Sequence, residues 1–103
     1  MTSAGALPVI VVHVKLFGFL KQFTDQTELE LPVGAGSTLR GLIHQLADRL
    51  GEEFRRAVLD RHGNLNGGVA LVLDREEIPP LRISEIHLWK DSDLFIVPMI
   101  EGG

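Results

Sequence analysis

The sequence has 103 residues and contains no cysteine. Disulfide bonds, thiol catalysis by the chain itself and cysteine metal sites are therefore excluded. Any sulfur chemistry in which this chain takes part has to use a group that the chain does not yet carry.

Positive charge is also scarce. Ten Lys and Arg residues stand against 14 Asp and Glu residues, which gives a net charge of −4 at pH 7. A nucleic-acid-binding domain shows a basic patch instead, so we expect no nucleic-acid partner. The segment richest in arginine contains Arg49, Arg55, Arg56 and Arg61, and acidic residues are interspersed among them. A mildly acidic surface is compatible with a basic protein partner.

Long hydrophobic runs are missing as well. Residues 1–8 lack a charged segment followed by a long apolar one, so they do not read as a signal peptide. The apolar run Val9–Val12 is too short to span a bilayer. We expect no membrane association and a cytoplasmic location.

The length and the 45% hydrophobic and 23% charged content are those of one small globular domain. Two N-terminal segments alternate in polarity, as strands with one buried face do. In residues 9–17 the buried face is Val12, Val14 and Leu16, and in residues 27–33 it is Leu29, Leu31 and Val33. Phe17 is unusual because it falls on the polar face. A short turn of helix is expected at residues 19–23, and Pro32 indicates that the second strand lies at an edge or is ending.

The clearest helix signal covers residues 39–50. Its apolar positions recur at helical spacing and are Leu39, Leu42, Ile43, Leu46, Ala47 and Leu50. Ser37 or Thr38 supplies an N-cap hydroxyl, and Gly51 is placed to be a left-handed C-cap. A second short helix is predicted at residues 52–59, with Phe54 and Val58 facing the core.

The C-terminal half predicts further strands. The continuous apolar run at residues 69–73 is typical of a buried strand, and residues 74–77 of a polar turn. A short strand is expected near Ile86 and Leu88. Residues 94–97 are apolar on both faces, which predicts a central strand. The result is an α+β domain in which a mixed sheet of four to five strands packs on one main helix. We expect a flexible arm at residues 1–8, the domain at 9–98 and an extended tail at 99–103.

Most candidates for chemistry have ordinary structural explanations. The four histidines show no metal-ligand spacing and are His13, His44, His62 and His87. The segment 34–37 precedes the helix but lacks the lysine of a phosphate loop. Asp91 and Asp93 suit a turn before a strand. We therefore expect no resident metal.

An apolar surface is predicted on the sheet face that the helix does not cover. If Leu94 and Ile96 point to the helix, then Phe95 and Val97 point the other way. Phe17 would lie beside them, and Pro98 follows directly. Aromatic anchors are common at protein interfaces, so these residues predict a partner-binding surface. Small sheets also leave a few apolar residues half exposed, and that alternative stays open.

The last residues suggest a functional tail. Pro98 ends strand pairing, and Met99, Ile100 and Glu101 are expected to extend away from the sheet. Gly102 and Gly103 have no Cβ, so a narrow channel can close around them. A carboxylate at Gly103 becomes reactive only once it is activated, most simply as an acyl-adenylate. It can then accept sulfide to become a thiocarboxylate, or an amine to become an amide. The alternative is a frayed end with no function.

Several pieces together resemble a known family. They are Val14-Lys15-Leu16-Phe17-Gly18 with Leu20-Lys21, the helix start Ser37-Thr38-Leu39, the strand at Val69, and Leu94-x-Ile96-x-Pro98 followed by Gly102-Gly103. The chain resembles the MoaD/ThiS-like sulfur carriers of the ubiquitin-like β-grasp superfamily over roughly residues 12–103. The molybdopterin-synthase small subunit is the nearer match. In place of that family's Asn-Gly turn after the third strand, this chain has Asp74-Arg75.

The resemblance implies roles for particular residues and partners. Gly103 would react at the end of a tail formed by Ile100, Glu101 and Gly102, and Phe17 and Val97 would contact partners. An E1-like adenylyltransferase (MoeB/ThiF-like) would use ATP to activate Gly103, and a persulfide donor would convert it to a thiocarboxylate. A large synthase subunit (MoaE-like) or another acceptor would receive the sulfur, as in molybdopterin biosynthesis. The chain would then be a carrier without a permanently bound cofactor, and not an enzyme.

Three other functions remain open at this point. The chain could be a protein modifier in the ubiquitin sense, joined through Gly103 to a lysine amine, or a thiamine-type carrier. It could also be an interaction or assembly domain whose tail is never activated, since some phage tail-assembly proteins resemble β-grasp domains with a similar Ile-Val-Pro ending.

Overall fold

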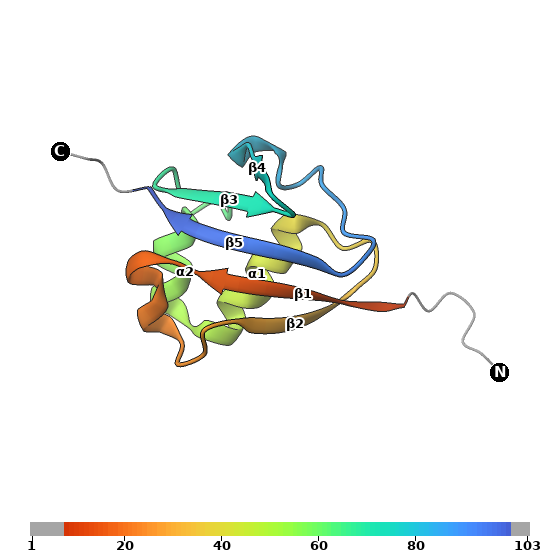
Figure 1. Cartoon of the computed structure of the whole chain (residues 1–103). Helices are drawn as coiled ribbons and strands as arrows, with labels where there is room; N and C mark the ends of the chain where they lie inside the picture. The colour runs from red at the N-terminus through yellow and green to blue at the C-terminus, as the bar shows by residue number, and fades with distance from the viewer. Residues whose placement is uncertain (1–7, 100–103) are drawn as a thin grey trace.

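The computed structural model describes residues 8–99. They form a five-stranded mixed sheet, and two α-helices cover one of its faces (Figure 1). The strands are β1 (Val9–Leu16), β2 (Leu29–Gly34), β3 (Val69–Leu73), β4 (Glu76–Ile78) and β5 (Ser92–Pro98). The helices are α1 (Leu39–Leu50) and α2 (Glu52–Val58), with the 3-10 helices η1 (Gly18–Phe23) and η2 (Pro80–Arg82). The predicted α+β class and mixed sheet are confirmed.

The strand order across the sheet is β2-β1-β5-β3-β4. β5 lies between β1, with which it runs parallel, and β3, with which it runs antiparallel. The central position predicted for the last strand is therefore confirmed. β2 lies at an edge, where the missing N–H of Pro32 removes no bond within the sheet.

Helix α1 is the main element that covers the sheet. Its apolar stripe is buried from Leu39 to Ala47. The Thr38 hydroxyl accepts a hydrogen bond from the Gly41 N–H at 3.0 Å, so Thr38 is the N-cap. Gly51 ends the helix with a φ of 111°, which favours glycine. Its ψ of 176° is extended and not the predicted left-handed helical value, because Gly51 is also the N-cap of α2.

Helix α2 completes the core at one end of the sheet. Phe54 and Val58 are fully buried, as predicted. The Phe54 ring meets the ring of Phe23 in η1 edge-on, with 5.7 Å between centroids. Burying a side chain of this kind stabilises the fold by roughly 1.5–3 kcal/mol, so this contact fixes η1 against the helices.

The polar turn predicted at residues 74–77 is confirmed only at its first two residues, and the strand that follows was not predicted. Asp74 and Arg75 form a two-residue turn, and β4 then pairs back on β3 with Leu73 opposite Glu76. Both turn residues have positive φ, 49° and 77°. Such a mirror-image turn matches the twist of a hairpin. Asp tolerates this conformation, but Arg there gives no sequence signal for it.

The strand expected near Ile86 and Leu88 is also absent from the described residues. That segment makes only an isolated bridge, between His87 and Thr38. Its backbone bonds go to the start of α1, where the Leu39 N–H donates to the Ile86 carbonyl at 2.8 Å. The apolar side chains therefore anchor a loop to the helix N-terminus and do not extend the sheet.

Within residues 8–99, none of the helices has both the length and the apolar character needed to cross a membrane.

Candidate functional site

The ends of strands β1 and β5 and the 3-10 helix η1 lie together at one end of the sheet. Because β1 and β5 are parallel, both finish at the same end of the sheet, and η1 wraps around this end (Figure 1). The Phe17 N–H donates to the Ile96 carbonyl at 3.1 Å and so prolongs the parallel pairing by one residue. Gly18 then turns the chain away with a φ of 58°.

Gly18 lies directly against Pro98. A Cβ added to Gly18 would be 2.7 Å from Cγ of Pro98, well inside van der Waals contact. The sequence analysis included Pro98 in the predicted partner-binding surface. In the structure Pro98 is buried, so it contributes little to that surface. This contact fixes the position of the proline, and the proline ring restricts φ. Together they set the path by which the chain leaves the sheet.

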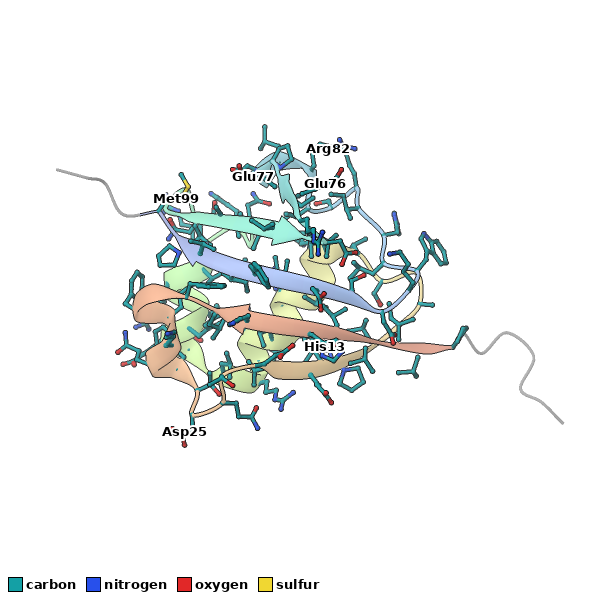
Figure 2. All side chains as sticks on the ribbon, viewed as in Figure 1. His13, Asp25, Glu76, Glu77, Arg82 and Met99 are labelled. Atoms are coloured by element: carbon teal, nitrogen blue, oxygen red, sulfur yellow. The ribbon has the colours of Figure 1, made fainter. Side chains whose placement is uncertain are left out.

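Met99 remains attached to the sheet. Its N–H donates to the carbonyl of Gly68 at 2.7 Å, and Figure 2 shows Met99 beside the start of β3. Strand β5 ends at Pro98, as predicted, and this single backbone bond follows beyond the strand. Alternate residues along β5 and its continuation bond to opposite neighbours. The Ile96 carbonyl accepts from the β1 side, and the Met99 N–H donates to the β3 side. The missing N–H of Pro98 faces the β1 side, where β1 has already ended.

The sheet face opposite the helices carries an apolar surface at this end. The rings of Phe17 and Phe95 lie 5.3 Å apart at 60°, a favourable tilted arrangement. Phe95 is 39% exposed and Met99 51% exposed, whereas Phe17 and Val97 are half-buried. Register places two small β3 residues beside them, with Ala70 opposite Val97 and Val72 opposite Phe95. We call these six residues the open-face patch.

Charged side chains border the open-face patch. The Nζ of Lys15 lies 5.7 Å from the Phe17 ring centroid. Across the sheet, Phe95 shares a row with Lys15, Val72 and Glu77. The next row contains Glu30, His13 and Asp93, and His13 Nδ1 is 3.8 Å from a Glu30 carboxylate oxygen. The rim holds both signs of charge, with carboxylates more numerous than amines. Such a rim complements a basic partner.

The structure thus brings Phe17, Phe95 and Val97 together as predicted from strand alternation. Ala70, Val72 and Met99 were missed, since only the strand register reveals them. Gly18 entered the sequence analysis only as part of the motif that resembles the family, and its contact with Pro98 was not predicted. The predicted tail residues Ile100, Glu101, Gly102 and Gly103 lie outside the described residues.

Within residues 8–99, the remaining sequence candidates do not form a metal site, and the two aspartates take part in structural hydrogen bonds. Among residues 8–99 there is no group of three His, Asp or Glu side chains placed to hold a metal ion. Asp91 accepts a hydrogen bond from the Val11 N–H at 2.9 Å, which ties the preceding turn to β1. Asp93 lies on the sheet face, and its N–H is capped by Asp74 Oδ1 at 2.9 Å.

No protein-family model matches the sequence, and no curated protein matches it either. Solved structures do. Small archaeal modifier protein 1 of Methanosarcina acetivorans is 23% identical with a TM-score of 0.71, covering 93% of this chain and 99% of that protein. A putative molybdopterin converting factor subunit 1 of Pyrococcus furiosus is 19% identical with a TM-score of 0.70, covering 88% and 99%.

A third match is the Amycolatopsis orientalis BexX/CysO complex, in which the matching chain is 22% identical with a TM-score of 0.67 and the match covers 89% of this chain and 99% of that one. At these identities the likeness is one of fold. The chain has the ubiquitin-like β-grasp fold that these modifier and converting-factor proteins share.

Proposed function

We propose that the chain is a sulfur-carrier protein that works through the carboxylate of Gly103. The observation that supports the proposal best is the position of the open-face patch. It lies at the end of β5, so a partner held on Phe17 and Phe95 would be next to Met99, the residue that precedes the rest of the tail. The patch would bind the partner, and the tail would reach the partner's active site.

The chemistry divides between the carrier and its partner. In the first step an oxygen of the Gly103 carboxylate attacks the α-phosphorus of ATP, and pyrophosphate leaves. In the second step the terminal sulfur of a persulfide attacks the acyl carbon, and AMP leaves. A second thiol of the donor then attacks the donor-side sulfur of this acyl disulfide, so that a disulfide forms on the donor and the thiocarboxylate leaves. Both glycines suit this use because side chains would obstruct a narrow active site.

We further propose an E1-like adenylyltransferase as the activating partner and a large MoaE-like subunit as the acceptor. The P. furiosus structure described as a molybdopterin converting factor subunit supports this choice of acceptor, and the BexX/CysO complex supports partners that bind a protein of this fold. ATP use is consistent with the expected cytoplasmic location.

Protein modification is the second candidate. It is favoured by the likeness to a small archaeal modifier protein, and it uses the same adenylate. The two functions differ in the next step. In a sulfur carrier a persulfide sulfur displaces AMP, and in a protein modifier a lysine amine displaces it. A non-activated assembly domain would form no adenylate at all.

Exchange of labelled pyrophosphate into ATP tests the first step. We expect exchange above background when the chain is mixed with an E1-like adenylyltransferase of its own organism, and background exchange when Gly102 and Gly103 are deleted. Exchange that persists in the deletion variant, or that is absent with every such enzyme of the organism, would contradict the proposal.

A further inference from the structure

A second surface lies on the helical side of the molecule, away from the open-face patch. A hollow of about 590 Å³ opens between α1, α2 and the loop that follows α2. Its basic side chains come from all three segments and are Arg40, His44, Arg55, Arg56, Arg61 and His62. Two carboxylates, those of Glu52 and Asp60, also line it.

The loop that forms one wall is held rigidly. Asp60 Oδ1 accepts hydrogen bonds from the N–H groups of His62 at 2.8 Å and Asn64 at 3.0 Å. The bond from Asn64 is the main cause that lowers the pKa of the Asp60 carboxyl, and the charges of His62 and Arg40 add to it. The loop bonds are therefore complete at neutral pH and are lost only as the pH falls through this lowered pKa.

The same loop lies directly on two basic side chains of α1. Arg40 Nη2 donates to the His62 carbonyl at 3.1 Å. His44 Nε2 lies 3.0 Å from the Gly63 carbonyl, so this nitrogen carries the proton and donates. Gly63 has a φ of 81°, and a Cβ there would be 3.1 Å from Cε1 of His44. Glycine therefore allows the wall to approach this closely.

The charges in the hollow are only partly neutralised. Arg55 pairs with Asp48 and with Glu52, and Arg56 Nε lies 3.7 Å from the same Glu52. Within the described part of the chain, Arg40 and Arg61 form no ion pair. Four guanidinium groups thus face a hollow with two carboxylates, in a chain whose net charge is −4. The excess of positive charge is local to this surface.

We propose that this hollow binds the phosphate group of a small molecule. Guanidinium groups match phosphate oxygens with paired hydrogen bonds, and the volume is in the range of about 300–1,000 Å³ typical of small-molecule sites. A concave site with acidic neighbours suits a compact anion better than an extended nucleic acid. The proposal does not depend on the sulfur-carrier function, because none of its residues belongs to the open-face patch.

Titration with pyrophosphate, followed by amide NMR of the ¹⁵N-labelled full chain, tests this site. We expect saturable shifts at residues 40–44 and 60–64. Replacing two exposed arginines of the hollow, Arg56→Gln with Arg61→Gln, should weaken binding about tenfold or more, because each charged hydrogen bond is lost. The control Arg49→Gln with Arg82→Gln removes the same charge outside the hollow and should change affinity less than twofold.

Adenosine diphosphate in a parallel titration identifies the source of the phosphate. Equal affinity for the two probes means that the site holds only the phosphate chain, and tighter binding of the nucleotide means that the base is held as well. Either result supports the proposal. Absence of saturable shifts with both probes, or equal weakening by the control pair, would overturn it.

Discussion

Replacing Phe17 and Phe95 together by serine is expected to weaken binding of the activating enzyme by about 100-fold or more. Truncation of an aromatic anchor at the centre of an interface typically costs about 2 kcal/mol or more. Such losses are not fully additive for side chains in contact, so we expect a combined factor of at least about 100. The centroids of the two rings lie 5.3 Å apart, beside the end of β5. Removing both rings therefore eliminates the centre of the open-face patch. Binding by isothermal calorimetry measures the effect directly.

The matched control replaces two other large exposed apolar residues, Leu81→Ser with Trp89→Ser. These side chains are 91% and 66% exposed and lie in η2 and in the loop before β5. The control pair should bind within about twofold of the unmodified chain, since scattered surface changes have little effect. Chemical denaturation of both variants confirms that they are folded. Equal losses in the two pairs would refute the role of the open-face patch.

Gly18→Ala is expected to lower the free energy of unfolding by about 2–5 kcal/mol. A φ of 58° costs a residue with a Cβ about 1–2 kcal/mol, and overpacking adds about 1–3 kcal/mol. The new methyl group would lie 2.7 Å from Pro98 Cγ, and neither the buried proline nor the turn can yield without cost. Urea denaturation measures the loss.

Gly67→Ala provides the comparison for that measurement. Gly67 has ordinary negative or extended φ and no atom within 4 Å of its added Cβ, so its substitution should stay within about 0.5 kcal/mol. If Gly18→Ala is as mild as Gly67→Ala, the Gly18–Pro98 contact does not fix the exit of the tail. Calorimetric titration of the Gly18→Ala variant with the activating enzyme then separates a loss of stability from a change in the position of Pro98. A displaced Pro98 is expected to weaken binding even in a variant that is folded.

The elements with strong periodicity were predictable from the sequence. Helix α1 and strands β1, β2, β3 and β5 each bury one face or both, so their hydrophobic patterns carry the signal. β4 was not predictable, because its hairpin depends on positive φ at Asp74 and Arg75 and Arg does not signal such a turn. The segment at Ile86 resembles a strand locally, but its backbone bonds go to the start of α1, and only the tertiary structure decides that.

The two surfaces differ in how far the sequence revealed them. Phe17 stood out as an aromatic on a polar face, and alternation placed Phe95 with it, so the centre of the open-face patch was predictable. The basic hollow was not. Along the sequence Arg55, Arg56 and Arg61 are mixed with acids, but folding adds Arg40 from α1 and places Arg49 elsewhere, near Glu28 and Glu30. Charge patterning along a chain does not show which side chains share a surface.

Intact-mass spectrometry tests the sulfur-carrier proposal most directly. The chain is incubated with ATP, an E1-like adenylyltransferase that supports pyrophosphate exchange, a persulfide donor and a thiol. The proposal predicts a mass gain equal to the difference between sulfur and oxygen, located on the peptide that ends in Gly103, and no gain when one alanine is appended after Gly103. An unchanged mass despite active exchange, or a gain that persists in the extended variant, would contradict it.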